Sequence, residues 1–251
     1  MSAMDNSKRI ALSSDVLLEI EDALNDPQFL GVPIGLTLSD SMAVAFYNAK
    51  RVWNWRVRLT DQLRYYYRRF HQPSFSASGY GHYEGQVVFT WLFDRADLKA
   101  FILPLVNNYG NDDSVVVGSL ASMQATLPNQ TTFVSWADFP KVDMKMWRGE
   151  FDRCEPTWRH RLSKVLERHT VPQYVTMFIM QNLQIETQRF MAAQLFLLSA
   201  KPRVIVTEYD RNSYASCLAL AANQIGIPVV SMIHGVYEPN QPFGCIPILS
   251  D

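Results

Sequence analysis

Cysteine is scarce in this sequence, and neither sign of charge dominates it. The three cysteines, Cys154, Cys217 and Cys245, are widely spaced and form no CxxC pair, which argues against a disulfide framework or a cysteine-based zinc site. We therefore expect a reducing, cytoplasmic compartment. A formal net charge of −1 gives no reason to expect a nucleic-acid partner. No apolar run approaches the roughly 20 residues of a membrane span, and no signal-peptide core is evident.

Several sequence motifs of nucleotide-binding and hydrolytic enzymes are also absent. No GxGxxG follows the first predicted strand and no GxxxxGK[ST] occurs, which argues against a dinucleotide-binding dehydrogenase and a P-loop NTPase. GxSxG is missing too, and this disfavours an α/β-hydrolase. HExxH and other tight metal-binding clusters do not occur, so we predict neither a metal site nor a cofactor.

The composition itself is that of an ordinary globular protein: of 251 residues, 48% are hydrophobic and 19% are charged. Residues 13–26 predict an amphipathic helix, because apolar side chains recur at helical spacing. Residues 39–70 continue in helical character with many aromatic side chains. The small-residue loop at 74–85 is a natural boundary. We therefore predict a helical N-terminal segment over 1–80, packed on a core formed by 81–251.

From residue 86 onward, short apolar runs alternate with helical stretches. The predicted strands are 86–93, 113–119, 131–136, 202–210 and 227–235, and the predicted helices are 94–110, 143–200 with a break near 170–172, and 211–226. The last strand–helix–strand unit is typical of a βαβ crossover, because both of its strands are apolar throughout. The sequence therefore predicts an α/β fold with a Rossmann-like parallel sheet flanked by helices.

Polar residues follow the predicted strands, at the edge of an open parallel sheet where ligands bind. We expect the catalytic residues to be His234, Asp94 and Glu208. We expect substrate to be bound by Gly235, Asp210, Arg211, Ser119 and Arg95.

His234 is the strongest single candidate, because an imidazole can act as a general base or hold a phosphate or a sugar hydroxyl. Gly235 would let the backbone approach a ligand closely. The alternative is a buried histidine bonded to a backbone carbonyl, followed by a turn glycine. Asp94 and Asp210 are also placed to cap the helices that follow them, and we favour the cap for Asp210. Glu208 stays open between a base and a group that positions a hydroxyl.

The segment 50–70 carries seven basic residues against one acid, Asp61, and interleaves them with Trp53, Trp55 and three consecutive tyrosines. Such a segment could lie on an anionic membrane surface or grip phosphates. The alternative, which we favour from sequence alone, is a helix whose aromatic side chains pack on the sheet while its arginines extend into water.

The last 48 residues resemble the end of the N-terminal domain of GT-B-fold glycosyltransferases that build bacterial surface polysaccharides. The resemblance lies in a strand, a helix, the Gly226-Ile227-Pro228 turn, a strand that ends in His234-Gly235, and a loop that leads to Asp251. CDP-glycerol glycerophosphotransferases share a similar His-Gly element.

The resemblance implies the N-terminal, acceptor-side half of a GT-B fold. It implies transfer of a sugar from a nucleotide-sugar donor to a glycan or lipid-linked acceptor, without a metal, by a protein at the inner face of the membrane. The chain stops at Asp251, before the expected donor domain, so we expect it to be inactive alone. The alternatives are a CDP-glycerol-type glycerophosphotransferase, a sugar-nucleotide 2-epimerase, or a non-catalytic Rossmann-like binding domain.

Overall fold

The computed structural model describes most of the chain and groups it into two compact units. The described residues are 8–42, 45–46, 51–71, 83–91, 96–109, 113–118, 127, 131–207 and 213–232. One unit contains the described residues among 1–73 and 143–188, and the other contains those among 74–142 and 189–236. The predicted boundary near residue 80 lies outside the described residues, and the local sequence pattern does not indicate that 143–188 group with the N-terminal residues.

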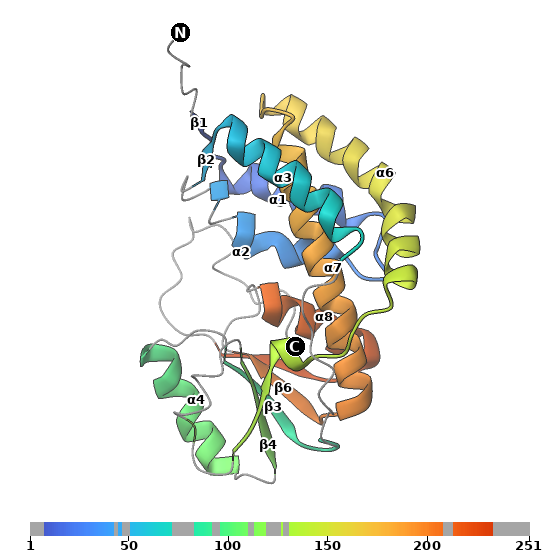
Figure 1. Cartoon of the computed structure of the whole chain (residues 1–251). Coiled ribbons are helices and arrows are strands. Elements are labelled where there is room, and N and C mark those ends of the chain that lie inside the picture. The colour runs from blue at the N-terminus through green and yellow to red at the C-terminus, as the bar shows by residue number, and fades with distance from the viewer. Residues whose placement is uncertain are drawn as a thin grey trace. The chain divides into compact units, whose positions relative to one another are not determined.

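The second unit is built on a sheet of five parallel strands (Figure 1). The strands are β3 (Val87–Trp91), β4 (Ser114–Gly118), β5 (Thr132–Ser135), β6 (Val204–Thr207) and β7 (Val229–Ser231). Their order across the sheet is β5-β4-β3-β6-β7. Starting from β3, the chain adds β4 and β5 on one side of β3, and it then returns to add β6 and β7 on the other side. The strand order therefore reverses between β3 and β6.

Helices cover the two sides of this sheet, which explains why its strands are apolar. Helix α4 (Ala96–Tyr109) contacts β3 and β4, and α8 (Ser213–Ile225) contacts β6 and β7. Figure 1 shows α4 on one side of the sheet and the C-terminal part of α7 (Val175–Ala200) on the other. On the α4 side, alternate residues of β3 pack with the helix in one buried cluster, which includes Val87, Phe89, Trp91, Ile102 and Val106. The prediction of a Rossmann-like parallel sheet flanked by helices is confirmed.

Two local details of this unit involve a proline and a glycine. Pro104 lies inside α4, which nevertheless continues to Tyr109. Gly226 has a φ of +77° directly after α8. Glycine adopts this left-handed conformation without steric cost and so ends the helix. The long helical stretch is two helices, α6 (Met144–Arg168) and α7, as the predicted break near 170–172 requires.

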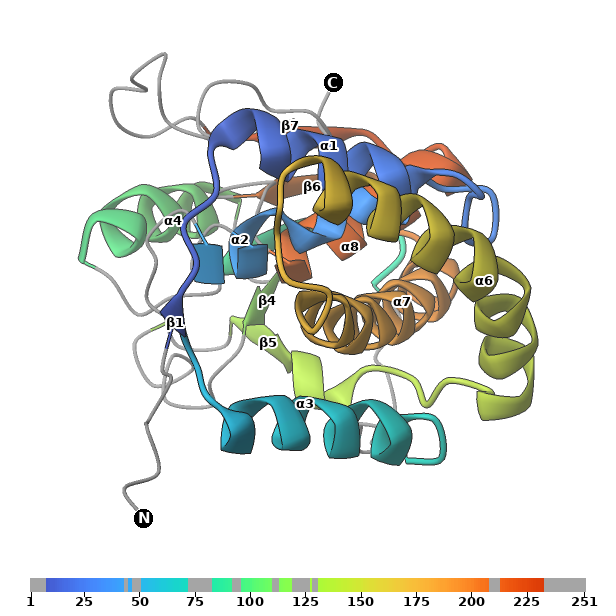
Figure 2. The ribbon, with the colours of Figure 1, turned by 90° about the horizontal axis from the view of Figure 1, so that it is seen from above.

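The first unit is mainly helical. Its elements include α1 (Ser14–Asn25), the 3-10 helix η1 (Ile34–Leu38), α2 (Ser39–Met42), α3 (Trp55–Arg68), α6, and residues 175–188 of α7. Figure 2 looks along α7 and shows α1, α3 and α6 around it. The apolar face of α1 is buried through Val16, Leu17, Ile20 and Leu24, as its spacing predicts. A large aromatic core fills the unit and includes Phe29, Phe46, Trp53, Trp147, Phe151, Trp158 and Phe178.

The stretch 39–70 is not the continuous helix that its composition indicates. Strand β2 (Val52–Trp53) pairs antiparallel with β1 (Lys8–Arg9) and interrupts it. Asn54 then begins α3, because its side-chain oxygen accepts a hydrogen bond from the backbone N–H of Val57 at 3.0 Å. No described helix is long and apolar enough to cross a membrane.

Candidate functional site

The candidate site is the edge of the parallel sheet where β3, β6 and β7 end. β3 pairs with β6 through Phe89 and Val206, and β6 pairs with β7 through Thr207 and Ser231. These three strands therefore finish side by side, next to the point where the strand order reverses. In doubly wound sheets the loops diverge at this point and leave a crevice for a ligand.

All eight residues predicted for the site lie outside the described residues. They are Asp94, Arg95, Ser119, Glu208, Asp210, Arg211, His234 and Gly235. What the structure does give is the strand that precedes each group: β3 precedes Asp94, β6 precedes Glu208, and β7 precedes His234. Those three strands are consecutive neighbours in the sheet. The roles of the eight side chains stay predictions.

Two buried threonines lie where β3 and β6 end, and sequence reasoning missed both. Thr90 comes one residue after the Phe89–Val206 pair, and Thr207 is the corresponding next residue of β6. Both are fully buried. The hydroxyl of Thr207 has no hydrogen-bond partner among the described residues, although its backbone carbonyl accepts from the N–H of Met232 at 2.7 Å. It is one of several buried polar atoms without a partner among the described residues, and it lies next to the predicted crevice.

An aromatic–arginine group lies at the same edge. Trp136 follows β5, and its ring lies 4.8 Å from that of Tyr214, a residue in the first turn of α8. The Arg189 guanidinium donates a hydrogen bond to the Tyr214 hydroxyl at 2.8 Å and lies 3.8 Å from the centre of its ring. Arg189 is only partly buried, so this arrangement brings a positive charge and a phenol to the end of the sheet.

This group can bind an anionic or hydroxyl-rich ligand. An arginine offers several N–H donors that match phosphate oxygens, and the partly exposed ring of Tyr214 can contact a flat or apolar ligand surface. Trp136 is buried and packs against Tyr214. The position of Tyr214 in the helix after β6 is a signal that could have been read from the sequence. Arg189 had no such signal, because it lies within a long helix, and only the antiparallel course of α7 beside β6 brings it to this edge.

Gly118 is the last residue of β4, and packing explains why a glycine is there. A Cβ at this position would lie 2.5 Å from the ring of Phe133 and 3.0 Å from the carbonyl oxygen of Trp91. No side chain fits there without movement of its neighbours. Gly118 is therefore explained by close packing within the sheet, independently of any ligand.

The first unit contains a buried ionic cluster between α3 and α6. Tyr65 donates a hydrogen bond to Glu155, Arg159 donates to the same carboxylate at 2.6 Å, and Arg69 donates to it at 2.8 Å. Arg69 also pairs with Asp152. Each of these polar side chains is paired with another member of the cluster. The cluster therefore holds α3 against α6 and does not present a reactive group.

The pKa values in this cluster shift as that arrangement requires. Burial opposes ionisation of Glu155, but the hydrogen bonds from Tyr65 and Arg159 and the charges of Arg159 and Arg69 outweigh it, so the pKa of Glu155 is lowered. Burial, together with the hydrogen bond to Glu155, raises the pKa of Tyr65. At neutral pH the carboxylate is therefore charged and the phenol is neutral.

The two described cysteines, Cys154 and Cys217, are buried. Burial raises the pKa of the Cys154 thiol to about 11. Cys154 is thus a thiol at neutral pH, without the thiolate that nucleophilic attack needs. Among the described residues, no three His, Cys, Asp or Glu side chains gather to hold a metal ion. Cys245 lies outside the described residues.

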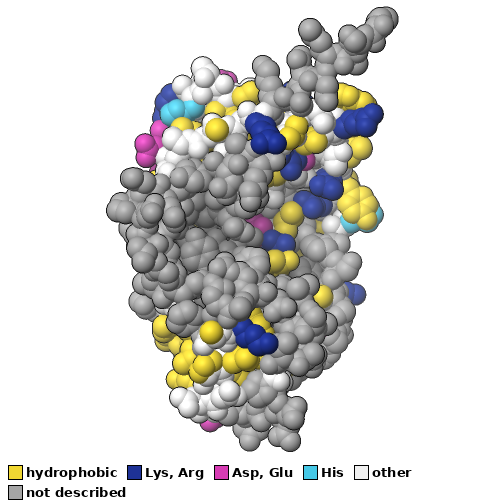
Figure 3. Space-filling view, turned by 90° about the vertical axis from the view of Figure 1, so that its left-hand side faces the viewer, with side chains coloured by type: hydrophobic (Ala, Val, Ile, Leu, Met, Phe, Trp, Pro, Cys, Tyr) yellow, Lys and Arg dark blue, Asp and Glu magenta, His cyan; other side chains and the backbone are white. Residues whose placement is uncertain are grey.

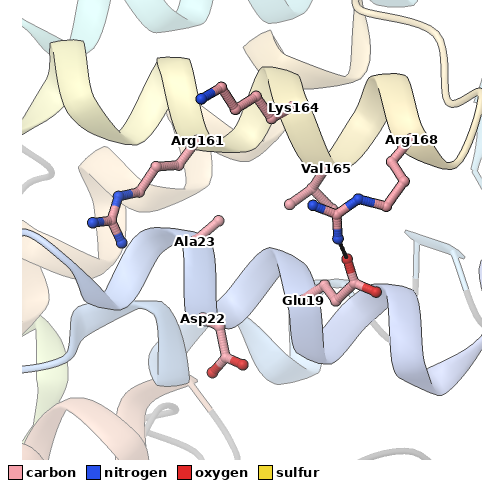
Figure 4. Close-up of a pocket in the computed structure, with 7 residues that line it drawn as sticks. All are labelled: Glu19, Asp22, Ala23, Arg161, Lys164, Val165 and Arg168. Carbon is pink, nitrogen blue, oxygen red and sulfur yellow. Dashed lines mark hydrogen bonds and ion pairs between the residues drawn. The ribbon is translucent and has the colours of Figure 1, made fainter.

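A pocket of about 330 Å³ lies between α1 and α6 (Figure 4) and is a poor candidate for a ligand site. Its walls carry both signs of charge, from Glu19 and Asp22 on α1 and from Arg161, Lys164 and Arg168 on α6. Arg168 pairs with Glu19 at 2.6 Å, and Arg161 pairs with Asp26. Opposite charges that neutralise each other leave little preference for a ligand of either sign, so this pocket is assigned to helix packing.

The comparisons with known proteins add nothing to this geometry. No protein-family model, no curated protein and no solved structure matches the chain. The candidate site therefore depends on the sheet and on the residues around its carboxyl edge.

Proposed function

We propose that this chain is the acceptor-side, Rossmann-like half of a glycosyltransferase of the GT-B type. The enzyme would move a sugar from a nucleotide-sugar donor to a hydroxyl of a glycan or lipid-linked acceptor. The reaction would take place at the edge where β3, β6 and β7 end. The support is the strand order β5-β4-β3-β6-β7, together with the resemblance of residues 204–251 to that enzyme class.

The chemical step needs a base and a group that stabilises negative charge. A base, for which His234 is the candidate, would take the proton from the acceptor hydroxyl as its oxygen bonds to the anomeric carbon of the sugar. The bond between that carbon and the phosphate oxygen would break, and a nucleoside diphosphate would leave. Arg189, fixed against Tyr214, is a candidate to stabilise the charge on the departing phosphates.

One observation carries most of this proposal: β6 lies between β3 and β7, with all three parallel. Candidate polar residues follow each of these strands in the sequence. Had β6 and β7 belonged to different sheets, Glu208 and His234 could not serve one reaction. Because the strands are neighbours, Glu208 and His234 can belong to one site, and they are the residues to mutate first.

The test is turnover by the complete gene product that contains this chain. We expect release of a nucleoside diphosphate with at least one donor from a panel of UDP-, GDP- and CDP-linked sugars. His234→Ala should lower kcat by roughly 10²-fold or more, which is the usual contribution of a general base. The melting temperature should stay near that of the wild type.

His160, on α6 in the first unit, provides a matched control. His160→Ala should leave kcat unchanged. Near-normal turnover by His234→Ala would remove His234 from the site, and no turnover with any donor would contradict glycosyl transfer itself.

A further inference from the structure

Helix α3 exposes a row of large hydrophobic side chains to solvent. Trp55 and Phe70, at the two ends of the row, are 66% and 67% exposed. Residues that recur every three or four positions form one face, which we call the α3 outer face. It consists of Trp55, Leu59, Leu63, Tyr66 and Tyr67 on the helix and of Phe70, which lies two residues after the last helical residue. Soluble proteins seldom leave so many large apolar side chains together in water, and such a face usually marks an interaction site.

The inner side of α3 is polar and charged, which is the reverse of an ordinary surface helix. Asp61 is buried, pairs with Arg51 at 2.6 Å and accepts a hydrogen bond from Gln181 at 3.1 Å. Tyr65 is buried against Glu155. These contacts fix the rotation of the helix about its axis, so the outer face cannot turn inward without leaving buried charges unpaired.

Three arginines among residues 51–69 also pack inward, which agrees with a polar inner side and an apolar outer side of α3. Arg51 lies over the ring of Phe178 at 4.2 Å, and Arg58 lies over the ring of Tyr174 at 3.7 Å. Arg69 belongs to the buried cluster. The packing alternative favoured from the sequence, with aromatics inside and arginines in water, is therefore wrong for these three arginines and for the outer-face aromatics.

The charges left outside on α3 are all positive. Arg56 and Arg64 are exposed, whereas the only acid of the helix, Asp61, is buried. Figure 3 shows this side of the molecule in profile at its upper right, where yellow and dark blue side chains alternate. Aromatic and leucine side chains flanked by arginine are the composition of helices that lie in the interface of an anionic bilayer.

We propose that the α3 outer face binds an anionic lipid surface, with α3 lying in the plane of the membrane. Trp55, Leu59, Leu63 and Phe70 would enter the headgroup region, and Arg56 and Arg64 would contact lipid phosphates. The occupant is a lipid surface rather than a protein because the exposed charge is uniformly basic and because tryptophan and tyrosine prefer this interface. The proposal does not depend on the glycosyltransferase proposal.

The test is sedimentation of the 251-residue chain with vesicles of phosphatidylcholine alone or of phosphatidylcholine with phosphatidylserine. We expect binding to the anionic vesicles, weaker binding to the neutral ones, and release by 0.5 M NaCl. The triple variant Trp55→Ala, Leu59→Ala, Leu63→Ala should bind about tenfold more weakly or worse. The double variant Arg56→Gln, Arg64→Gln should lose about tenfold on anionic vesicles alone.

Leu18 and Leu198 provide the control, since both are exposed leucines outside α3. Leu18→Ala, Leu198→Ala should bind vesicles as the wild type does, and all variants should keep the wild-type melting temperature within a few degrees. Absent binding, equal binding to neutral vesicles, or unchanged binding by the triple variant would overturn the proposal. A wild-type dimer that the triple variant converts to a monomer would also overturn it, in favour of a contact between two copies.

Discussion

Glu155 shows how a single buried carboxylate can hold two helices together. It accepts hydrogen bonds from Tyr65 and Arg69 on one side and from Arg159 on its own helix. Of the charged groups in this cluster only Glu155 is buried, and its charge is stable only while its partners remain to compensate it. The cluster is therefore a structural feature of the first unit whose contribution depends on pH.

Glu155→Gln should lower the free energy of unfolding by about 2 kcal/mol at neutral pH, because Arg159 loses its anionic partner while Arg69 keeps only its pair with Asp152. The folded-state pKa of Glu155 is lowered, so its stabilisation is full above the ordinary glutamate value of about 4.3. That stabilisation is lost as the pH falls through the lower, folded-state value. Urea unfolding between pH 7 and pH 3 measures both effects.

Glu19 is the control for this prediction, because it forms an exposed pair with Arg168. Glu19→Gln should cost less than about 1 kcal/mol. If Glu155→Gln were as mild as Glu19→Gln, the cluster would not be what fastens α3 to α6.

At the scale of single elements, α3 is where sequence reasoning failed most clearly. The periodic aromatic and basic residues between 50 and 70 do predict an amphipathic helix, and a helix is present. Periodicity gives the position of the apolar face but not which face is buried. That choice depends on Glu155, Phe178 and Tyr174, which lie far away in the sequence, so it could not be read locally.

The caps of α1 and α3 give a prediction at this scale. The Asn54 side chain accepts a hydrogen bond from Val57, whereas Ser13 occupies the same position at α1 without a side-chain hydrogen bond. Asn54→Ala should therefore lower the free energy of unfolding by about 1 kcal/mol. Ser13→Ala should change it by a few tenths at most. Thermal unfolding followed by circular dichroism measures both, and equal losses would contradict the role given to Asn54.

The strands, by contrast, could be predicted from the sequence, because a strand that is buried on both sides has apolar residues along its whole length. β3 and β4 are buried at every position, and each was predicted within two residues of its ends. The two-residue strands β1 and β2 were missed, since so short a pair leaves no periodic pattern. Thr90, Thr207 and Arg189 were missed for a related reason: each is placed at the edge by the sheet order or by the course of α7, not by a local motif.

At the scale of the whole molecule, each unit is assembled from separated segments of the chain. Helix α1, from the N-terminal segment, packs on α6, which follows β5 in the sequence. The segment that follows α1 also contacts α6, because Trp158 and Arg153 donate hydrogen bonds to the backbone carbonyls of Pro27 and Gln28. A fragment that starts at residue 81 would therefore expose the face of α6 that α1 covers.

We propose that a ligand binds where β3, β6 and β7 end. Hydrogen–deuterium exchange of the complete gene product, measured with each nucleotide-sugar of the panel in turn, is the sharpest test of this site. We predict slower exchange with the bound donor in peptides that contain the ends of β3 and β6 and the first turn of α8, around Thr207 and Tyr214. Protection confined to α1 and α6, or no protection with any donor, would contradict the claim.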